Sequence, residues 1–245
     1  MSNPIISRGF SDSNSFASEN PMTISGTINK LFLMFVLLCT SFGIVFYQYG
    51  LGYLDKVNLL MKIGLLGGFI IAMVVIFTRK AMGVLVPVYA FLEGMALGGI
   101  SAIANSMIPG IPFQAVAATF MTLFAMLILY KTGTIKATEK FKGIVATATL
   151  GIFLFYLISF VLSFFNVPIL AQYASSVSPL AIGINAVFCI VAALNLILDF
   201  HSIELGESTG IDKENEWYGA FGLMVTLVWL YIEVLNLLSR LSRND

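Results

Sequence analysis

The chain has 245 residues, of which 58% are hydrophobic and 11% are charged, and its formal net charge at pH 7 is zero. Soluble domains contain about 45–50% apolar and about 25% charged residues, so the composition excludes an ordinary soluble globular protein and indicates an integral membrane protein. The balanced charge gives no indication of nucleic-acid binding.

The first 28 residues are rich in serine and asparagine and contain too few apolar residues to form a core. We therefore expect residues 1–28 to be a disordered tail. The segment has no basic stretch followed by a short apolar core and a small-residue cleavage site, so we expect no removable signal peptide. The first apolar span would then target the chain to the membrane.

Long apolar stretches follow this tail. A bilayer core about 30 Å thick needs about 20 apolar residues per helix, and stretches of that length predict an all-α membrane domain over residues 29–245. Cys39 and Cys189 lie inside spans, where a small buried side chain is expected rather than a disulfide or a metal site. The seven predicted spans lie near residues 31–50, 58–78, 82–104, 114–131, 143–165, 179–202 and 217–240.

The distribution of Lys and Arg predicts the orientation of this bundle. Nine of these residues fall beside the N-terminus or in the loops after spans two, four and six: Arg8, Lys30, Arg79, Lys80, Lys131, Lys136, Lys140, Lys142 and Lys213. The opposite side has Lys56, Lys62, Arg240 and Arg243. The positive-inside rule then places the N-terminus in the cytoplasm and the C-terminus outside. A re-entrant last span would return the C-terminus to the cytoplasm, and the charge distribution also allows that topology.

Three acidic residues lie inside predicted spans: Glu93 in "VYAFLEGMALGGI", Asp199 in "CIVAALNLILDFHSIE" and Glu233 in "LMVTLVWLYIEVLNLL". A charged side chain at the bilayer centre costs roughly 2.5–3.5 kcal/mol on insertion scales, so such residues face other helices or a wet cavity and mark functional sites. Asn195, Asp199 and Ser202 share one helical face. A second polar stripe in the last span contains Thr226, Glu233, Asn236 and Arg240.

Several segments resemble the Bax inhibitor family of seven-span membrane proteins, in its bacterial YccA-like branch. They are "MTISGTINK" (22–30), "FLEGMALGGIS" (91–101), "LDFHSIE" (198–204) and above all "EWYGAFGLMVTLVWLYIEVLNLLSRL" (216–241). The resemblance implies a bundle whose last helix is central and a location in the cell inner membrane. It also implies a pH-dependent leak of calcium or other cations and, in some members, restraint of a membrane-bound protease.

The resemblance also implies an acidic pair, with one member in span six and one in span seven, which correspond to Asp199 and Glu233. Two carboxylates held close together share a proton and would titrate near neutral pH. The position in span seven is usually Asp rather than Glu, and 34 residues separate the pair here, about ten more than in the better-known branch. The two acids meet only if the last helix begins well outside the membrane.

Other partners for these acids remain open. Asp199 could instead be a water-exposed residue at the cytoplasmic end of its span. By depth, Glu93 is a second partner for Glu233, and Lys62 could neutralise Glu233 as a structural ion pair. Arg79 lies level with Asp199, where the family's basic latch would fall, and its guanidinium suits a carboxylate better than the ammonium of Lys80 does.

Catalysis is not expected. Asp199, His201 and Ser202 are triad residue types, but their spacing on one helix points His201 away from the other two. The chain has a single histidine, so it has no HExxH zinc motif, and it lacks the Gly-x-Gly-Asp motif of intramembrane aspartyl proteases. We expect no catalytic residue, cofactor or resident metal.

Two functions are therefore compatible with the sequence. The first is a pH-sensitive cation leak that is gated by protonation of intramembrane carboxylates. The second is a non-conducting regulator that binds another membrane protein, such as a membrane-bound protease, through the N-terminal tail or the bundle surface. Deletion of the tail would abolish the activity of a regulator but not that of a leak.

Overall fold

A computed structural model of the chain describes residues 19–165, 167, 169, 173 and 176–244. The described residues form seven long helices and no strand apart from an isolated bridge between Pro21 and Asp212. The helices are α2 (Ile24–Gly50), α3 (Leu54–Thr78), α4 (Met82–Met107), α5 (Ile111–Lys131), α6 (Glu139–Ser163), α8 (Pro179–Ser208) and α9 (Asn215–Asn244). All seven are long and apolar enough to cross a membrane, which confirms the predicted seven-span all-helical class.

Hydroxyl side chains begin three of these helices. The side chains of Thr23, Thr138 and Ser178 each accept a hydrogen bond from the backbone N–H three residues later, at the N-termini of α2, α6 and α8. Such caps satisfy N–H groups that have no partner within the helix. They lie outside the apolar stretches, so hydropathy alone does not locate them.

Two helix boundaries differ most from the prediction. α2 begins at Ile24 rather than near residue 31, so residues 24–28, which the prediction placed in the tail, form its first turn. α8 continues to Ser208 rather than 202 and so includes the first residues of the polar segment between the last two predicted spans. Hydropathy marks only the part of a helix in hydrocarbon, and both helices extend beyond it. Residues 1–18 of the predicted tail lie outside the described residues.

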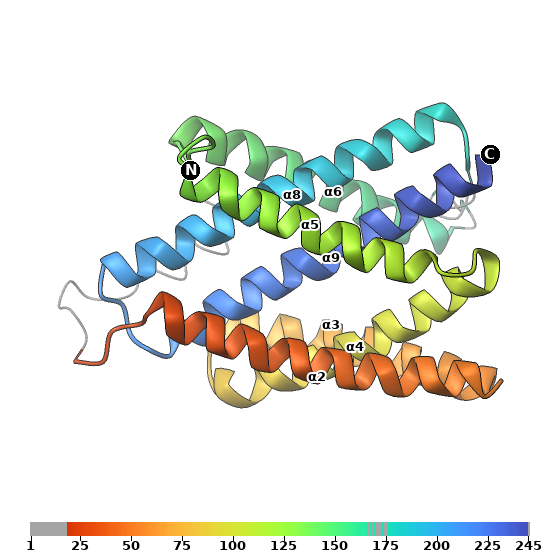
Figure 1. Ribbon diagram of the computed structural model, residues 1–245, viewed down its shortest axis with the longest axis horizontal. Helices are drawn as coiled ribbons and strands as arrows, with labels where there is room; N and C mark the ends of the chain where they lie inside the picture. The colour runs from red at the N-terminus through yellow and green to blue at the C-terminus, as the bar shows by residue number, and fades with distance from the viewer. Residues whose placement is uncertain (1–18, 166, 168, 170–172, 174–175, 245) are drawn as a thin grey trace.

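α9 is the most buried of the seven spans. It contacts α2, α4, α5 and α8, and Figure 1 shows it passing behind the space between α2 and α5. It runs as one continuous helix from one end of the bundle to the other, so the last span is not re-entrant (Figure 1). The start of α2 and the end of α9 therefore lie at opposite ends, which we call the inner and outer ends respectively.

Glycines bring α2, α3 and α4 into close contact. A Cβ atom on Gly64 of α3 would lie 2.5 Å from the backbone nitrogen of Ala96 and 2.6 Å from the carbonyl oxygen of Leu92, both on α4. Gly94 of α4 meets the backbone of α2 at Leu38 in the same way. Small residues allow membrane helices to approach closely and gain van der Waals contact. These glycines therefore allow α2, α3 and α4 to pack closely.

Candidate functional site

A cavity of about 530 Å³ between α3, α4, α8 and α9 contains two of the three intramembrane acids. Glu93 reaches it from α4 and Asp199 from α8, whereas the residues of α3 that line it are apolar. The inner-end portion is bounded by Met22, Tyr218 and Gly219. The polar side chains on its wall are Tyr89, Glu93, Thr149, Asn195, Asp199, Ser202, Tyr218 and Thr226.

Asp199 faces α9 across this cavity. Its Oδ1 atom lies 3.9 Å from the place where a Cβ would stand on Gly222, and Thr226 interacts with its carboxyl group. Its Oδ2 atom is buried and has no hydrogen-bond partner in the described part of the chain. A buried polar atom without a partner is costly, so this oxygen is positioned to hold a proton, a water molecule or a cation that enters the cavity.

Glu93 lies on the opposite wall. Tyr89, one turn earlier on α4, lies close enough for its hydroxyl to interact with this carboxyl group. Gly68 of α3 leaves room for this carboxyl group, because a Cβ there would lie 3.0 Å from Oε1. The second carboxyl group of the cavity therefore comes from span three.

Glu233 belongs to a separate polar cluster nearer the outer end. Its side chain is 1% exposed, and its Oε1 atom accepts hydrogen bonds from the Tyr156 hydroxyl at 2.7 Å and the Trp229 indole at 3.0 Å. Its Oε2 atom accepts a third from the Asn185 amide at 2.8 Å. Three donors from α6, α8 and α9 thus satisfy this carboxyl group, and it links the three helices.

Arg240 lies two turns beyond Glu233 on the same face of α9 and is 4% exposed. Its guanidinium lies 4.3 Å from the centre of the Tyr173 ring and donates a hydrogen bond to the carbonyl oxygen of Ser176. Burial raises the pKa of the Tyr173 hydroxyl, an effect that the charge of Arg240 partly opposes. The tyrosine therefore stays protonated at neutral pH, and the charge of Arg240 holds the segment before α8 against α9.

The structure does not bring Asp199 and Glu233 together. Asp199 lies beside Thr226, and Glu233 lies seven residues farther along α9, about 10 Å at 1.5 Å per residue. α8 and α9 are antiparallel neighbours, so Glu233 instead meets Asn185, 14 residues before Asp199. The acid that shares a cavity with Asp199 is Glu93.

The two basic candidates are also placed differently from the prediction. Lys62 is exposed on α3, whereas the partners of Glu233 come from α6, α8 and α9. Arg79 ends α3, and its guanidinium lies 5.0 Å from the centre of the Tyr218 ring on α9. Tyr218 in turn lines the cavity, so Arg79 stands behind the aromatic ring at its inner end.

The N-terminal segment covers the same inner end. The N–H of Met22 donates to the carbonyl of Ile211 at 2.7 Å, and the N–H of Lys213 donates to the carbonyl of Asn20 at 2.9 Å. The Met22 side chain, 1% exposed, is part of the cavity wall. Backbone hydrogen bonds therefore hold residues 20–22 against the turn between α8 and α9.

A buried ion pair fixes that attachment. Glu216, at the start of α9, forms an ion pair with Lys30 of α2 and accepts hydrogen bonds from Thr23 N–H at 3.0 Å and from Thr23 Oγ1 at 3.1 Å. Glu216 is 1% exposed. The contacts hold the beginning of α2 against the beginning of α9.

Several residues of both sites were not expected from the sequence. Tyr89, Tyr156 and Asn185 are polar residues inside apolar spans. A polar residue in an apolar span is a signal for a buried site, but the prediction included only acids and the residues of two polar stripes. Of the predicted polar stripe in the last span, Thr226, Glu233 and Arg240 are buried, and they repeat every seven residues. Asn236, the fourth residue of that stripe, is exposed. It follows Glu233 by three residues, which places it about 60° away from the buried face of the helix.

His201 lies away from Asp199 and Ser202, as the helical spacing predicts. It lines a different hollow, where its Nδ1 atom is 3.4 Å from the hydroxyl of Tyr130. Within the described ranges, no group of three or more His, Cys, Asp or Glu residues is arranged to hold a metal ion. Among the described residues, the carboxyl groups that line the acidic cavity are those of Glu93 and Asp199.

Comparison with known proteins gives one family. A search of the curated proteins finds no significant match. The family model described as Bax inhibitor 1 like matches residues 3–243, which is nearly the whole chain, together with all seven spans and both polar sites. The chain is thus a multi-pass membrane protein that belongs to the Bax inhibitor 1-like family.

Proposed function

We propose that this protein is a pH-sensitive leak for cations, calcium in particular, in the cell inner membrane. The observation that carries the proposal is the cavity within the spanning helices that Glu93 and Asp199 both line. Acidic residues at membrane depth mark ion pathways and proton relays. The bacterial YccA-like branch is part of the same proposal, as is a cytoplasmic N-terminus at the inner end, where most Lys and Arg residues lie.

The two acids would act as a unit. Burial favours the protonated form of a carboxyl group, and a second carboxylate in the same cavity would add to that preference. The ionised pair attracts a cation into the cavity, and the protonated pair does not. The neighbouring titratable or charged groups are Tyr89 on α4, Tyr218 on α9 and, behind Tyr218, Arg79.

Weak coordination suits a leak better than a tight site. Conduction requires a cation to enter and to leave again, so its binding must be weak. Two carboxyl groups with hydroxyl and amide oxygens meet that requirement. In the proposed mechanism, protonation of the pair changes how α4 and α8 pack against α9 and so alters passage.

The test is calcium flux into liposomes that contain the purified protein and a calcium-sensitive dye. We expect a leak whose rate changes between about pH 6 and 8, and we expect Glu93→Gln/Asp199→Asn to abolish that change. Glu233→Gln is the matched control, because it neutralises an acid outside the cavity and should keep the pH profile. Flux equal to that of empty liposomes at every pH would refute the proposal.

The second candidate is a non-conducting regulator of another membrane protein, such as a membrane-bound protease. The attachment of residues 20–23 to the α8–α9 turn favours it, because a partner that binds the tail would act directly on the inner end of the bundle. Deletion of residues 1–18 keeps those contacts. A regulator should lose its effect on the partner in this variant, whereas a leak should retain its flux.

A further inference from the structure

A groove runs along the bundle between α2 and α5, on the side of α9 away from the acidic cavity. It consists of a hollow of about 280 Å³ towards the outer end and another of about 750 Å³ towards the inner end. The two hollows share no lining residue but lie within about one turn of each other on the same helices, since Leu31 and Leu223 line the inner hollow and Phe35 and Met224 line the outer one. From Ile28 to Phe46 on α2 the groove spans 18 residues, about 27 Å.

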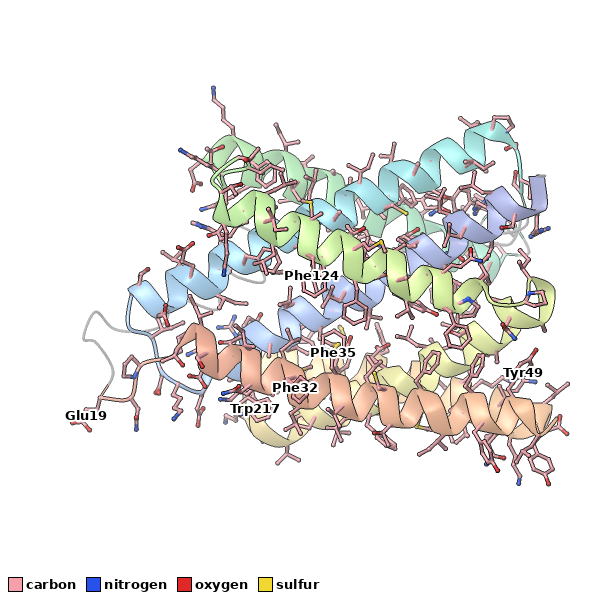
Figure 2. All side chains as sticks on the ribbon, viewed as in Figure 1. Glu19, Phe32, Phe35, Tyr49, Phe124 and Trp217 are labelled. Carbon is pink, nitrogen blue, oxygen red and sulfur yellow. The ribbon has the colours of Figure 1, made fainter. Side chains whose placement is uncertain are left out.

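The walls of the groove are apolar and partly exposed. Phe35 of α2 and Phe120 of α5 approach across it with ring centres 5.7 Å apart, and α9 forms the floor at Met224 and Leu227. Figure 2 shows Phe35 and Phe124 lying in the space between α2 and α5. An apolar groove that is open along spans that cross the membrane has the polarity for an acyl chain.

The inner end of the groove is cationic. Lys131 and Lys136 line it and are both exposed, and His201 lies beside them. One carboxylate, Glu204, is also present, and it accepts a hydrogen bond from the hydroxyl of Tyr130. Two lysines against one engaged carboxylate leave a positive rim where the apolar walls end.

From this arrangement we infer that the groove binds one phospholipid with an anionic headgroup. One acyl chain lies between α2 and α5 on the floor of α9, and the phosphate lies between Lys131 and Lys136. Lysines beside a membrane attract anionic lipid with about 1 kcal/mol each, which is about fivefold in affinity per lysine. The headgroup charge therefore decides which lipid occupies the groove.

The site also adjoins the acidic cavity. Val228 of α9 lines both the groove and the cavity, and Ile203 of α8 lines both the cavity and the inner hollow. A bound lipid would thus contact the helices that carry Thr226 and Asp199. The lipid site itself does not depend on the proposed leak.

The experiment is native mass spectrometry of the full chain in detergent, titrated with phosphatidylglycerol or with phosphatidylcholine of the same acyl chains. We expect one phosphatidylglycerol to bind at least about tenfold more tightly than phosphatidylcholine, because two lysines contribute. Lys131→Gln/Lys136→Gln should remove most of that preference. Lys80→Gln/Lys140→Gln, which changes the net charge equally among exposed inner-end lysines outside the groove, should retain it.

A third variant tests the acyl-chain part of the site. Val116→Trp fills the groove from α5 and should weaken the binding of both lipids while leaving the lysines in place. Thermal unfolding in lipid-free detergent identifies any variant that fails to fold, and Val116→Phe serves if the tryptophan variant does not fold. Equal affinity for the two lipids, or equal losses in the two lysine pairs, would overturn the inference in favour of unselective lipid contact.

Discussion

The cluster around Glu233 makes a sharp prediction about hydrogen bonding inside the membrane. In Glu233→Gln, the remaining oxygen can still accept from Tyr156 and Trp229, while the new amide group faces Asn185. The Oδ1 atom of Asn185 is buried without a hydrogen-bond partner among the described residues. If the Asn185 amide turns over, this oxygen accepts from the new amide. We therefore expect Glu233→Gln to lower the free energy of unfolding by about 1 kcal/mol or less.

Glu233→Ala should cost considerably more. It removes two interhelical hydrogen bonds, to Tyr156 and Asn185, and such bonds contribute about 0.6 kcal/mol on average and about 1.7 kcal/mol at most in membrane proteins. Their sum is about 1–3 kcal/mol, to which the lost Trp229 bond and the vacated volume add. The expected loss in the free energy of unfolding is therefore at least about 2 kcal/mol.

The measurement is reversible unfolding by dodecyl sulfate in mixed micelles, followed by circular dichroism and by the fluorescence of the two tryptophans, Trp217 and Trp229. Glu214→Gln, which changes an exposed acid just before α9, is the control and should stay within about 0.5 kcal/mol of the parent. Lys62→Met should neither change the stability of Glu233→Gln nor rescue it, because Lys62 is exposed on α3. Equal losses in the free energy of unfolding for Glu233→Gln and Glu233→Ala would refute the hydrogen-bond argument. Recovery of that free energy in Glu233→Gln/Lys62→Met would instead support an ion pair between Glu233 and Lys62.

Three further changes test the packing of the bundle, each by the same unfolding assay. Lys30→Met leaves the buried Glu216 carboxylate without its cation and should lower the free energy of unfolding by about 2–3 kcal/mol. This is less than the about 3–5 kcal/mol expected for a fully buried pair, because the Lys30 side chain is 18% exposed. Lys30→Met/Glu216→Gln should recover part of the loss, and no recovery would contradict the pairing. Gly64→Ala should cost about 1–3 kcal/mol through overpacking against α4, whereas Gly43→Ala, with no atom within 4 Å of the added carbon, should cost nothing. Arg79→Ala removes a cation–π contact with α9 and should lower the free energy of unfolding by about 0.5–1 kcal/mol, equally at pH 6 and pH 8. A loss confined to pH 8 would instead indicate that Arg79 interacts with an ionised acid of the cavity.

Much of the fold followed from the sequence alone. Bilayer thickness fixes the length of an apolar span, and a spanning helix satisfies its own backbone hydrogen bonds, so composition and hydropathy determined seven helices. The family followed from local segments such as residues 216–241, and the match over residues 3–243 confirmed it. The importance of Glu93, Asp199 and Glu233 stays a prediction, although the cost of an acid in lipid is a local property that the sequence alone identifies.

The partners of those acids were decided only by the tertiary structure. The depth at which α8 and α9 pass one another depends on where each helix begins and on how it packs, and hydropathy determines neither. With α9 starting at Asn215, Asp199 lies beside Thr226 and Glu233 meets Asn185, so span three supplies the second acid of the cavity. Residue types therefore determined which side chains need partners, and the relative placement of the helices determined which partners they have.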